Sequence, residues 1–376
     1  YEDTMHAGHY ENNKRAVDLM IRSSNDIIRD LLRYHVDFAR DGLGNLAFTR
    51  EGAHSQPRIL FHEDITGKEI TQTLLTAAKI KENIEICEYM TMVDLISKDN
   101  TVCGIIAMDR NDQAFPVYSQ YVVLACGGIG GLFKNSTNFS HIAGDGVGIA
   151  MKHHVEMENL DYIQIHPTTL YSEKPGRRFL ISESVRGEGA ILLNRKGERF
   201  VDELLPRDVV ARAIYEQMEK DDMPYVHLSL ENIDKKTIME HFPNIYQHCL
   251  EEGYDVTKEC IPVVPAQHYF MGGIKVDYES KTSMDRLYAV GETACNGVHG
   301  RNRLASNSLL ESLVFAKRAA HNMTENELID ILAPSADEYV ENSDKSQYQD
   351  EEKLDEYYGE LIRQKIDEAD EAMKTA

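Results

Sequence analysis

The residues best suited to chemistry lie in one stretch near the end of the sequence, from 287 to 320. The run 287–290 predicts a short buried strand, Gly291 lets a ligand approach the backbone closely, and Glu292 places a carboxylate at the strand's carboxyl end. The polar residues 306–308 suit a helix start, whose free N–H groups attract an anion or the polar edge of a ring. This order predicts a cofactor site; an ordinary capped helix is the alternative.

Two segments further upstream carry related signals. The apolar run 117–124 predicts a strand that leads into Gly127 and Gly128, where the absence of side chains permits close contact between backbone and cofactor. Asp145 lies between two glycines and opens a predicted helix over 147–152, whose start can hold a flavin or ribityl group. Plain helix capping by Asp145 is the alternative.

Composition limits the kinds of partner. The chain has 376 residues and a net charge of -23, which predicts two or three domains and argues against nucleic acid as a ligand. A dicarboxylate ligand would need a locally positive site, to which Arg207, Arg303, His166 and His268 would contribute. Much of the negative charge lies in 337–376, with fourteen acidic against five basic residues, which predicts a solvated helix or tail.

The six cysteines form no CxxC pair and no metal-ligand spacing, so we expect reduced thiols and no metal site. No apolar run approaches the roughly 18 residues of a membrane span, and no secretory signal opens the chain. These observations predict no membrane association and a cytoplasmic location.

Apolar periodicity predicts the remaining elements. Helices are expected over 12–34, 68–80 and 208–220, with a long C-terminal helix over about 350–374. Strands are expected over 84–86, 92–96, 102–108, 117–124 and 190–194.

Nine short motifs occur in a fixed order over about residues 1–320. They are REGAHS at 50–55, RILFHEDITGKEI at 58–70, VVLACGG at 122–128, GDGVGIAM at 144–151, QIHPTTLY at 164–171, SESVRGEGAIL at 182–192, PRDVVARAI at 206–214, AQHYFMGGIKVD at 266–277 and GET…HGRNRLASNSLLE at 291–311. This series resembles the succinate dehydrogenase and fumarate reductase flavoprotein superfamily, and most closely its L-aspartate oxidase branch.

The resemblance implies an α/β fold with a Rossmann-like FAD-binding domain and an inserted α+β capping domain. The implied boundaries are 1–159 and 271–325 for the two parts of the FAD-binding domain, 160–270 for the capping domain and 326–376 for an acidic helical segment. Relatives of this superfamily begin with a βαβ unit carrying GxGxxG, which is absent from this sequence. We therefore expect the ADP-cradling part to be missing, so that the parent protein is longer or this chain binds FAD weakly.

Cofactor residues follow from the same resemblance. Glu292 is expected to accept hydrogen bonds from ribityl or ribose hydroxyls, while Ser308 and Leu309 offer backbone N–H groups to the flavin's pyrimidine edge. The full set implied for FAD is Gly127, Gly128, Asp145, Glu292, Asn307, Ser308 and Leu309.

Substrate residues are implied on both sides of the flavin. Arg303 matches the arginine that grips the α-carboxylate, with His268 donating to the same group. His166 and Ser182, with Glu183 beside it, match the positions that hold the other carboxylate, although the family more often has Thr in place of Ser182. Without the family, either histidine reads as an ordinary core or loop residue.

Arg207 matches the superfamily's proton donor or acceptor. Because a guanidinium has a pKa above about 12, electrostatic stabilisation is an equally good description of its role. Taken alone, an arginine at this helix start reads as a surface ion pair.

Glu51 is the residue that discriminates between substrates. It occupies the position where aspartate oxidases keep a carboxylate for the substrate's ammonium group, and its alternative is a local bond to Arg50 or His54. Gln164 is compatible with a contact to the substrate or to the flavin edge.

The implied function is FAD-dependent oxidation of L-aspartate to iminoaspartate, the first step of NAD biosynthesis, with O2 or fumarate reoxidising the flavin. L-aspartate or fumarate is the expected small-molecule ligand, and quinolinate synthase is the expected consumer of the product. Two alternatives stay open: a soluble fumarate reductase or succinate dehydrogenase flavoprotein, and a truncated, non-catalytic chain with impaired FAD binding.

Overall fold

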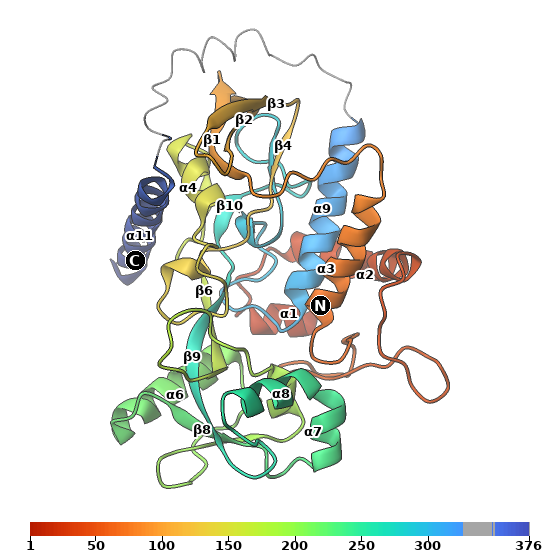
Figure 1. Cartoon of the computed structure of the whole chain (residues 1–376), viewed down its shortest axis with the longest axis vertical. Helices are drawn as coiled ribbons and strands as arrows, with labels where there is room; N and C mark the ends of the chain where they lie inside the picture. The colour runs from red at the N-terminus through yellow and green to blue at the C-terminus, as the bar shows by residue number, and fades with distance from the viewer. Residues whose placement is uncertain (326–347, 349, 376) are drawn as a thin grey trace.

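The computed structural model describes residues 1–325, 348 and 350–375. Figure 1 shows an upper body of strands and helices above a smaller lower unit. Strands β6 (Ile163–Leu170) and β9 (Ile261–Phe270) pair antiparallel and run between the two parts. This mixed α/β arrangement is the predicted fold class.

Helices form one side of the body: α1 (Glu2–Ala7), α2 (Lys14–Arg33), α3 (Thr66–Lys79) and α9 (Asn307–Glu325). The side chain of Asn13 caps α2 by accepting from the backbone N–H groups of Arg15 and Ala16. The buried face of α2, including Met20, packs against Val314 and Phe315 of α9. This packing fixes the start of α9 beside the candidate site.

Strands form the other side of the body. One sheet contains β1 (Thr91–Lys98), β2 (Thr101–Met108) and β3 (Ala114–Tyr118). A second is the parallel pair β4 (Val122–Leu124) and β11 (Leu287–Ala289). A third contains β5 (Met157–Glu158), β10 (Gly273–Lys275) and β12 (Ala294–Cys295). Short 3-10 turns follow β4 and β11 at Gly130–Leu132 and Gly291–Thr293, and α4 (Asp145–Lys152) packs over the strands. The carboxyl ends of β4 and β11 therefore lie side by side.

The C-terminal helix α11 (Glu351–Thr375) confirms the helix predicted over 350–374. The expected solvated tail is only partly correct, because Leu354, Tyr358, Ile362 and Ile366 pack into the core beside α4. The Tyr358 hydroxyl donates to the carbonyl of Val93 at 2.9 Å. The rest of the predicted acidic segment, 326–347, lies outside the described residues.

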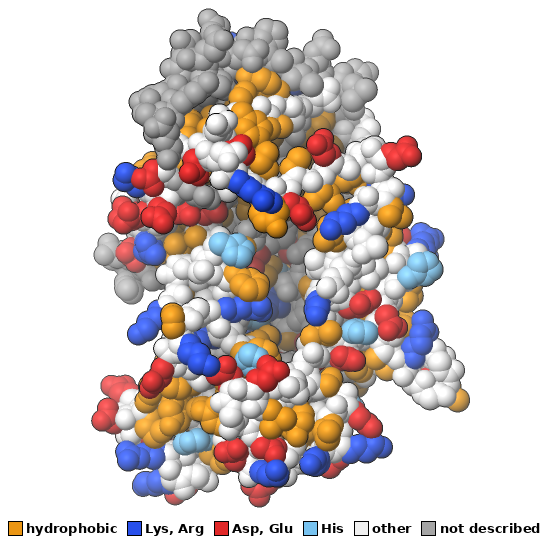
Figure 2. All heavy atoms as spheres, viewed as in Figure 1, with side chains coloured by type: hydrophobic (Ala, Val, Ile, Leu, Met, Phe, Trp, Pro, Cys, Tyr) orange, Lys and Arg blue, Asp and Glu red, His pale blue; other side chains and the backbone are white. Residues whose placement is uncertain are grey.

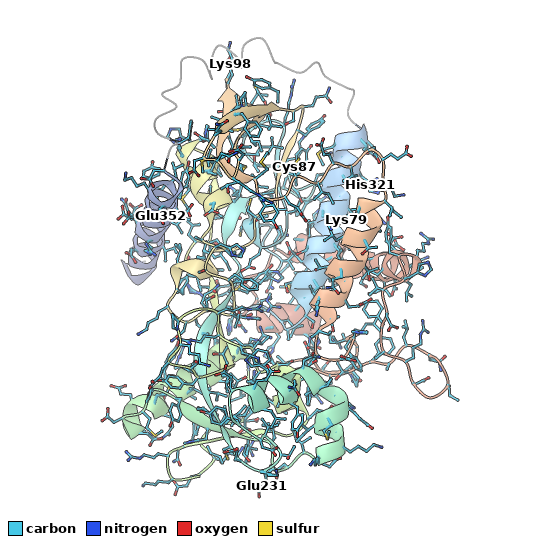
Figure 3. All side chains as sticks on the ribbon, in the orientation of Figure 1. Lys79, Cys87, Lys98, Glu231, His321 and Glu352 are labelled. Atoms are coloured by element: carbon cyan, nitrogen blue, oxygen red, sulfur yellow. The ribbon has the colours of Figure 1, made fainter. Side chains whose placement is uncertain are left out.

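The lower unit has a hydrophobic core of its own. Strands β7 (Ile191–Leu193) and β8 (Val226–Ser229) extend the β6–β9 sheet, and α5 (Glu183–Gly187), α6 (Arg207–Asp221), α7 (Lys235–His241) and α8 (Pro243–Glu251) surround it. Figure 3 places Glu231 at the end of this unit farthest from the body. The separate core supports the proposed capping domain over 160–270.

A polar contact also joins the lower unit to the body away from β6 and β9. The Asp64 carboxylate accepts from Asn244 Nδ2 at 2.6 Å and from the Ile245 backbone N–H at 2.9 Å. A carboxylate from the body thus caps the start of α8.

Two strand predictions are wrong. Residues 84–86 belong to no strand, and Ile84 and Ile86 are largely exposed, because alternating apolar residues form a strand only where a partner backbone pairs with them. The run 117–124 is divided between β3 and β4, which belong to different sheets, because Ser119 N–H bonds Cys103 whereas Val122 N–H bonds Arg286.

Within the described residues, the helices are too short or too polar for any of them to cross a bilayer.

Candidate flavin and substrate site

A buried cluster of polar side chains forms where the lower unit meets the body. Strand β6 supplies His166 and Gln164, strand β9 supplies His268, and the first residues of α5 and α6 supply Glu183 and Arg207. Arg303 reaches the same cluster from the loop before α9. Figure 2 shows Lys, Arg and His side chains gathered around the hollow in the middle of the molecule. The structure thus brings together six of the residues predicted for the substrate.

Arg207 is held from two directions. Its Nε donates to Glu183 Oε2, and its Nη1 donates to Gln164 Oε1 at 2.8 Å. The amide nitrogen of Gln164 donates to the backbone carbonyl of Arg303 at 2.7 Å and to Asn302 Oδ1 at 2.9 Å. The alternative of a surface ion pair for Arg207 is therefore wrong, since this residue is 7% exposed and hydrogen-bonded inside the buried cluster.

Glu183 stays ionised inside this cluster. Burial acts to raise its pKa, but the charges of Arg207 and Arg186 outweigh burial, so the pKa lies below its ordinary value. Arg186 Nη2 lies 3.7 Å from Glu183 Oε2, on the side away from its hydrogen bond to Glu203. One carboxylate therefore neutralises part of the charge of two arginines.

Arg303 has no carboxylate partner among the described residues. It is 4% exposed, and burial together with the charge of Arg207 lowers its pKa to about 10, so the guanidinium remains charged at neutral pH. Its Nη1 makes a long contact of 3.4 Å with the Leu304 carbonyl, and its Nε donates to none of the described residues. A buried cation with free N–H donors is a feature of an anion-binding site.

The two histidines are neutral donors or acceptors. Burial lowers the pKa of both His166 and His268 well below the ordinary value, and the charge of Arg207 adds to the effect. His166 Nδ1 accepts from the Thr168 N–H at 3.2 Å, which puts the proton on Nε2, and Nε2 has no partner among the described residues. The positive charge of the cluster therefore comes from arginines alone.

Glu51 and Ser182 lie on the wall of a neighbouring cavity of about 1020 Å³. Glu51 Oε2 accepts from the Ser306 hydroxyl at 2.8 Å, whereas Arg50 bonds the His54 carbonyl, so the local pairing considered for Glu51 does not occur. Burial, and then the charge of Glu183, raises the pKa of Glu51. The Ser182 hydroxyl shares a 2.7 Å hydrogen bond with Ser184 and contacts neither histidine.

The carboxyl ends of β4 and β11 fit the sugar part of a flavin. Gly127 has a left-handed φ of 81°, and a Cβ on Gly128 would lie 2.3 Å from Glu292 Oε1, so the turn needs glycine there. Glu292 Oε1 accepts from the Phe270 N–H at 2.9 Å, and no hydrogen bond from the described part of the chain reaches its Oε2, which suits a hydroxyl donor. Asp145 starts α4 next to this turn, where its charge adds to burial in raising the pKa of Cys126.

The start of α9 fits the ring end. Asn307 and Leu309 line the large cavity, where the first N–H groups of a 19-residue helix lack helical partners. The sequence predicts capping by the polar residues 306–308, but the Ser306 side chain bonds Glu51 and Asn307 Nδ2 donates to Thr4 at 2.9 Å. Ser308 lies in the same turn. The residues present therefore fit FAD, with assignments that remain proposals.

Several residues of the site were given no role from the sequence, although Arg186, Tyr269 and Asn302 lie within the quoted motifs. These are Thr137, Arg177, Arg186, Tyr269 and Asn302. Thr137 and Arg177 lie in loops, and only the folded structure shows that these loops reach the site. Arg301, two residues before Arg303, donates to Asp161 at 2.8 Å and lies over the Tyr162 ring.

A buried carboxyl behind the site predicts a dependence of stability on pH. Glu311 of α9 is 1% exposed and accepts from Asn296 Nδ2 at 2.6 Å, and burial raises its pKa to about 7. Between pH about 4.5 and about 7, Glu311 keeps its proton in the folded protein but releases it in the unfolded chain. The contribution of Glu311 to stability therefore falls as the pH rises through this range and is absent above about 7.

Glu311→Gln removes that contribution. Between pH 5 and pH 8 we expect the wild type to lose on the order of 3 kcal/mol more unfolding free energy than the variant does. Urea unfolding at both pH values measures the difference, and parallel curves for the two proteins would contradict the assignment.

Comparison with known proteins places the chain. Residues 1–309 match the family model described as FAD binding domain. The structure is similar to that of an Escherichia coli quinol fumarate reductase variant, with a TM-score of 0.82, 28% identity, and coverage of 93% of this chain and 66% of that chain. Fold and site thus define the class, a flavoprotein built on an FAD-binding domain.

Within this class, two relatives are more similar in sequence. The chain is 53% identical over 320 residues to the L-aspartate oxidase of Clostridium perfringens, which covers 85% of this chain and 72% of that protein. It is 52% identical over 323 residues to the L-aspartate oxidase of Clostridium acetobutylicum, covering 86% of this chain and 74% of that protein. The chain belongs to the L-aspartate oxidase family.

Proposed function

We propose that the protein oxidises L-aspartate to iminoaspartate. The observation that supports this most directly is the combination of a buried arginine cluster with free donors and, on the adjacent cavity wall, the carboxylate of Glu51. A substrate with two carboxylates and one ammonium group carries the complementary charges. Bound FAD would accept the hydride from Cα, and O2 or fumarate would take the electrons away.

Arg303 would bind the α-carboxylate, because its free Nε and the planar N–H groups of its guanidinium can donate to two oxygens. His268 is close to Arg303 and Arg207 and would donate to the same group. The unpartnered Nε2–H of His166 suits the second carboxylate. Ser182 has a weaker case, since its hydroxyl is already shared with Ser184.

Loss of the Cα hydrogen requires a lone pair on the neighbouring nitrogen, so the substrate's ammonium group must first give up a proton. Glu51 would receive it, since burial and the charge of Glu183 raise its pKa and make it a stronger base than an exposed carboxylate. The Ser306 hydroxyl fixes the orientation of the carboxylate. The Arg207 guanidinium, held by Glu183 and Gln164, would stabilise negative charge on the bound substrate.

A second function, fumarate reduction or succinate oxidation, is favoured by the similarity to quinol fumarate reductase and by the same arginine cluster. Absorption spectroscopy of the purified protein separates the alternatives. A flavin band shows that FAD is retained, which a non-catalytic chain with impaired binding would lack. We expect anaerobic L-aspartate to bleach this band and succinate to leave it; bleaching by succinate alone would favour the second function.

Replacement of Glu51 by Gln tests the role of its charge. We expect kcat/KM for L-aspartate to fall about ten- to hundredfold, because a charged hydrogen bond of about 1.5–3 kcal/mol and a proton acceptor are lost. Fumarate reduction by the same variant, which involves no ammonium group, is the internal control and should change less than about threefold. An equal loss in both reactions would assign Glu51 a structural role.

The consumer of iminoaspartate is a separate question. Quinolinate synthase stays a prediction.

A further inference from the structure

Arg303 differs from the other buried arginines of the site in how it is held. Arg207 donates to Glu183 and Gln164, and Arg186 donates to the Glu203 carbonyl and lies 3.7 Å from the Glu183 carboxylate. Arg303 has one long contact of 3.4 Å to a carbonyl and no carboxylate among the described residues. Something other than hydrogen bonds must hold this side chain in place.

The ring of Tyr269 fills that role geometrically. The guanidinium carbon of Arg303 lies 4.6 Å from the centre of the ring, over its face. Tyr269 follows His268 in β9 and is 7% exposed, so the contact is removed from water. Cation–π attraction is strongest in such desolvated positions.

The ring is itself fixed by two contacts. The Tyr269 hydroxyl donates to Glu311 Oε2 at 3.4 Å, and the His299 ring meets the Tyr269 ring edge-on at 5.4 Å between centres. Glu311 is in turn bonded by Asn296. A chain of contacts therefore runs from the second turn of α9 to the face on which Arg303 lies.

An aromatic ring and a carboxylate hold an arginine with different consequences. A carboxylate occupies the planar N–H fork and cancels the charge, as Glu183 does in part for Arg207. A ring attracts the flat face of the guanidinium and leaves every N–H at its edge free. An arginine that must bind a substrate carboxylate needs the second arrangement.

We propose that Tyr269 is a positioning residue, whose ring holds Arg303 for a substrate carboxylate without using any of its N–H donors. This inference rests on the proposed function, because it takes a carboxylate as the ligand of Arg303. It adds a residue that acts through Arg303.

Fluorinated phenylalanines at position 269 test the proposal without changing the shape of the ring. Succinate is the probe, because it carries two carboxylates and is read by calorimetry, independently of turnover. On the FAD-loaded protein we expect Tyr269→Phe to change the Kd less than about threefold, and each added fluorine to weaken binding further, since fluorine withdraws electrons from the ring face. An unchanged Kd across the series would overturn the proposal.

A double-mutant cycle supplies a second test. Tyr269→Leu should weaken succinate binding about tenfold, which corresponds to about 1.4 kcal/mol, and should raise the KM for L-aspartate more than it lowers kcat. In an Arg303→Leu background the same change should have no further effect on the Kd. A full additional loss in that background would show that Tyr269 does not act through Arg303.

Tyr288→Leu is the matched control, because Tyr288 is 1% exposed and its ring packs edge-on against Tyr121 rather than under an arginine. We expect it to lower stability and leave the succinate Kd unchanged. A wild-type protein that binds succinate but fails to oxidise L-aspartate would reject the proposed function, while the Tyr269 series would still be informative.

Discussion

Arg303→Leu should lower kcat/KM for L-aspartate roughly thirtyfold to several thousandfold, which corresponds to a loss of about 2 to 5 kcal/mol in transition-state stabilisation. The guanidinium is 4% exposed and keeps its charge, and its free Nε leaves it available to a carboxylate. Leucine fills part of the volume but leaves the substrate's carboxylate buried without its counter-charge. Steady-state kinetics at fixed pH and salt measure the loss.

Arg301→Leu is the control for this change, since Arg301 lies two residues earlier in the same loop. Its side chain is partly exposed and bonds Asp161 over the Tyr162 ring, and within the described residues it forms no ion pair with the carboxylates of the arginine cluster. We expect kcat/KM to change less than about threefold, as for other exposed ion pairs. Near-normal turnover in Arg303→Leu would remove the carboxylate-binding role.

Glu183→Gln should lower the free energy of unfolding by about 3 to 5 kcal/mol. The carboxylate is 4% exposed and lies between Arg207 and Arg186, so its neutralisation leaves two buried guanidinium groups without a counter-charge. The amide also presents an NH2 group to donors. Because Glu183 orients Arg207, turnover should fall in the same variant.

Urea denaturation with and without a dicarboxylate tests this prediction. Succinate should restore part of the lost stability, since its carboxylates supply charge to the same arginines. Glu252→Gln serves as control, because Glu252 pairs with the largely exposed Lys174 on the surface and should change stability by less than about 1 kcal/mol. Equal effects of the two substitutions would mean that the buried cluster is solvated in the folded protein.

The sequence was sufficient to predict the fold class and the gathering of the cluster, because ordered motifs report which segments meet. His166, His268, Arg207 and Arg303 come from four separate motifs and lie together in the structure. The locally positive site that a dicarboxylate would need occurs within a chain of net charge -23, as expected.

Other features were beyond sequence reasoning, because they depend on three-dimensional neighbours. Nothing in the run AQHYF shows that Tyr269 lies beneath Arg303, or that one amide of Gln164 bonds both Arg207 and the Arg303 backbone. The protonation of the histidines also depends on burial, which cancels the charge that their residue type suggests. The incorrect strand at 84–86 has the same origin, since apolar alternation does not reveal whether a partner strand is present.

Packing of α11 against α4 has a consequence for the integrity of the protein. Tyr358 and Ile362 rest on Gly148 and Gly144, where a Cβ would lie 2.6 and 2.7 Å from them, so the two helices are fitted closely. Because α4 begins at Asp145, next to the glycine turn that faces Glu292, α11 supports the wall of the proposed flavin pocket. Proteolysis near residue 350 would therefore loosen a site whose chemical groups all lie more than forty positions earlier in the sequence.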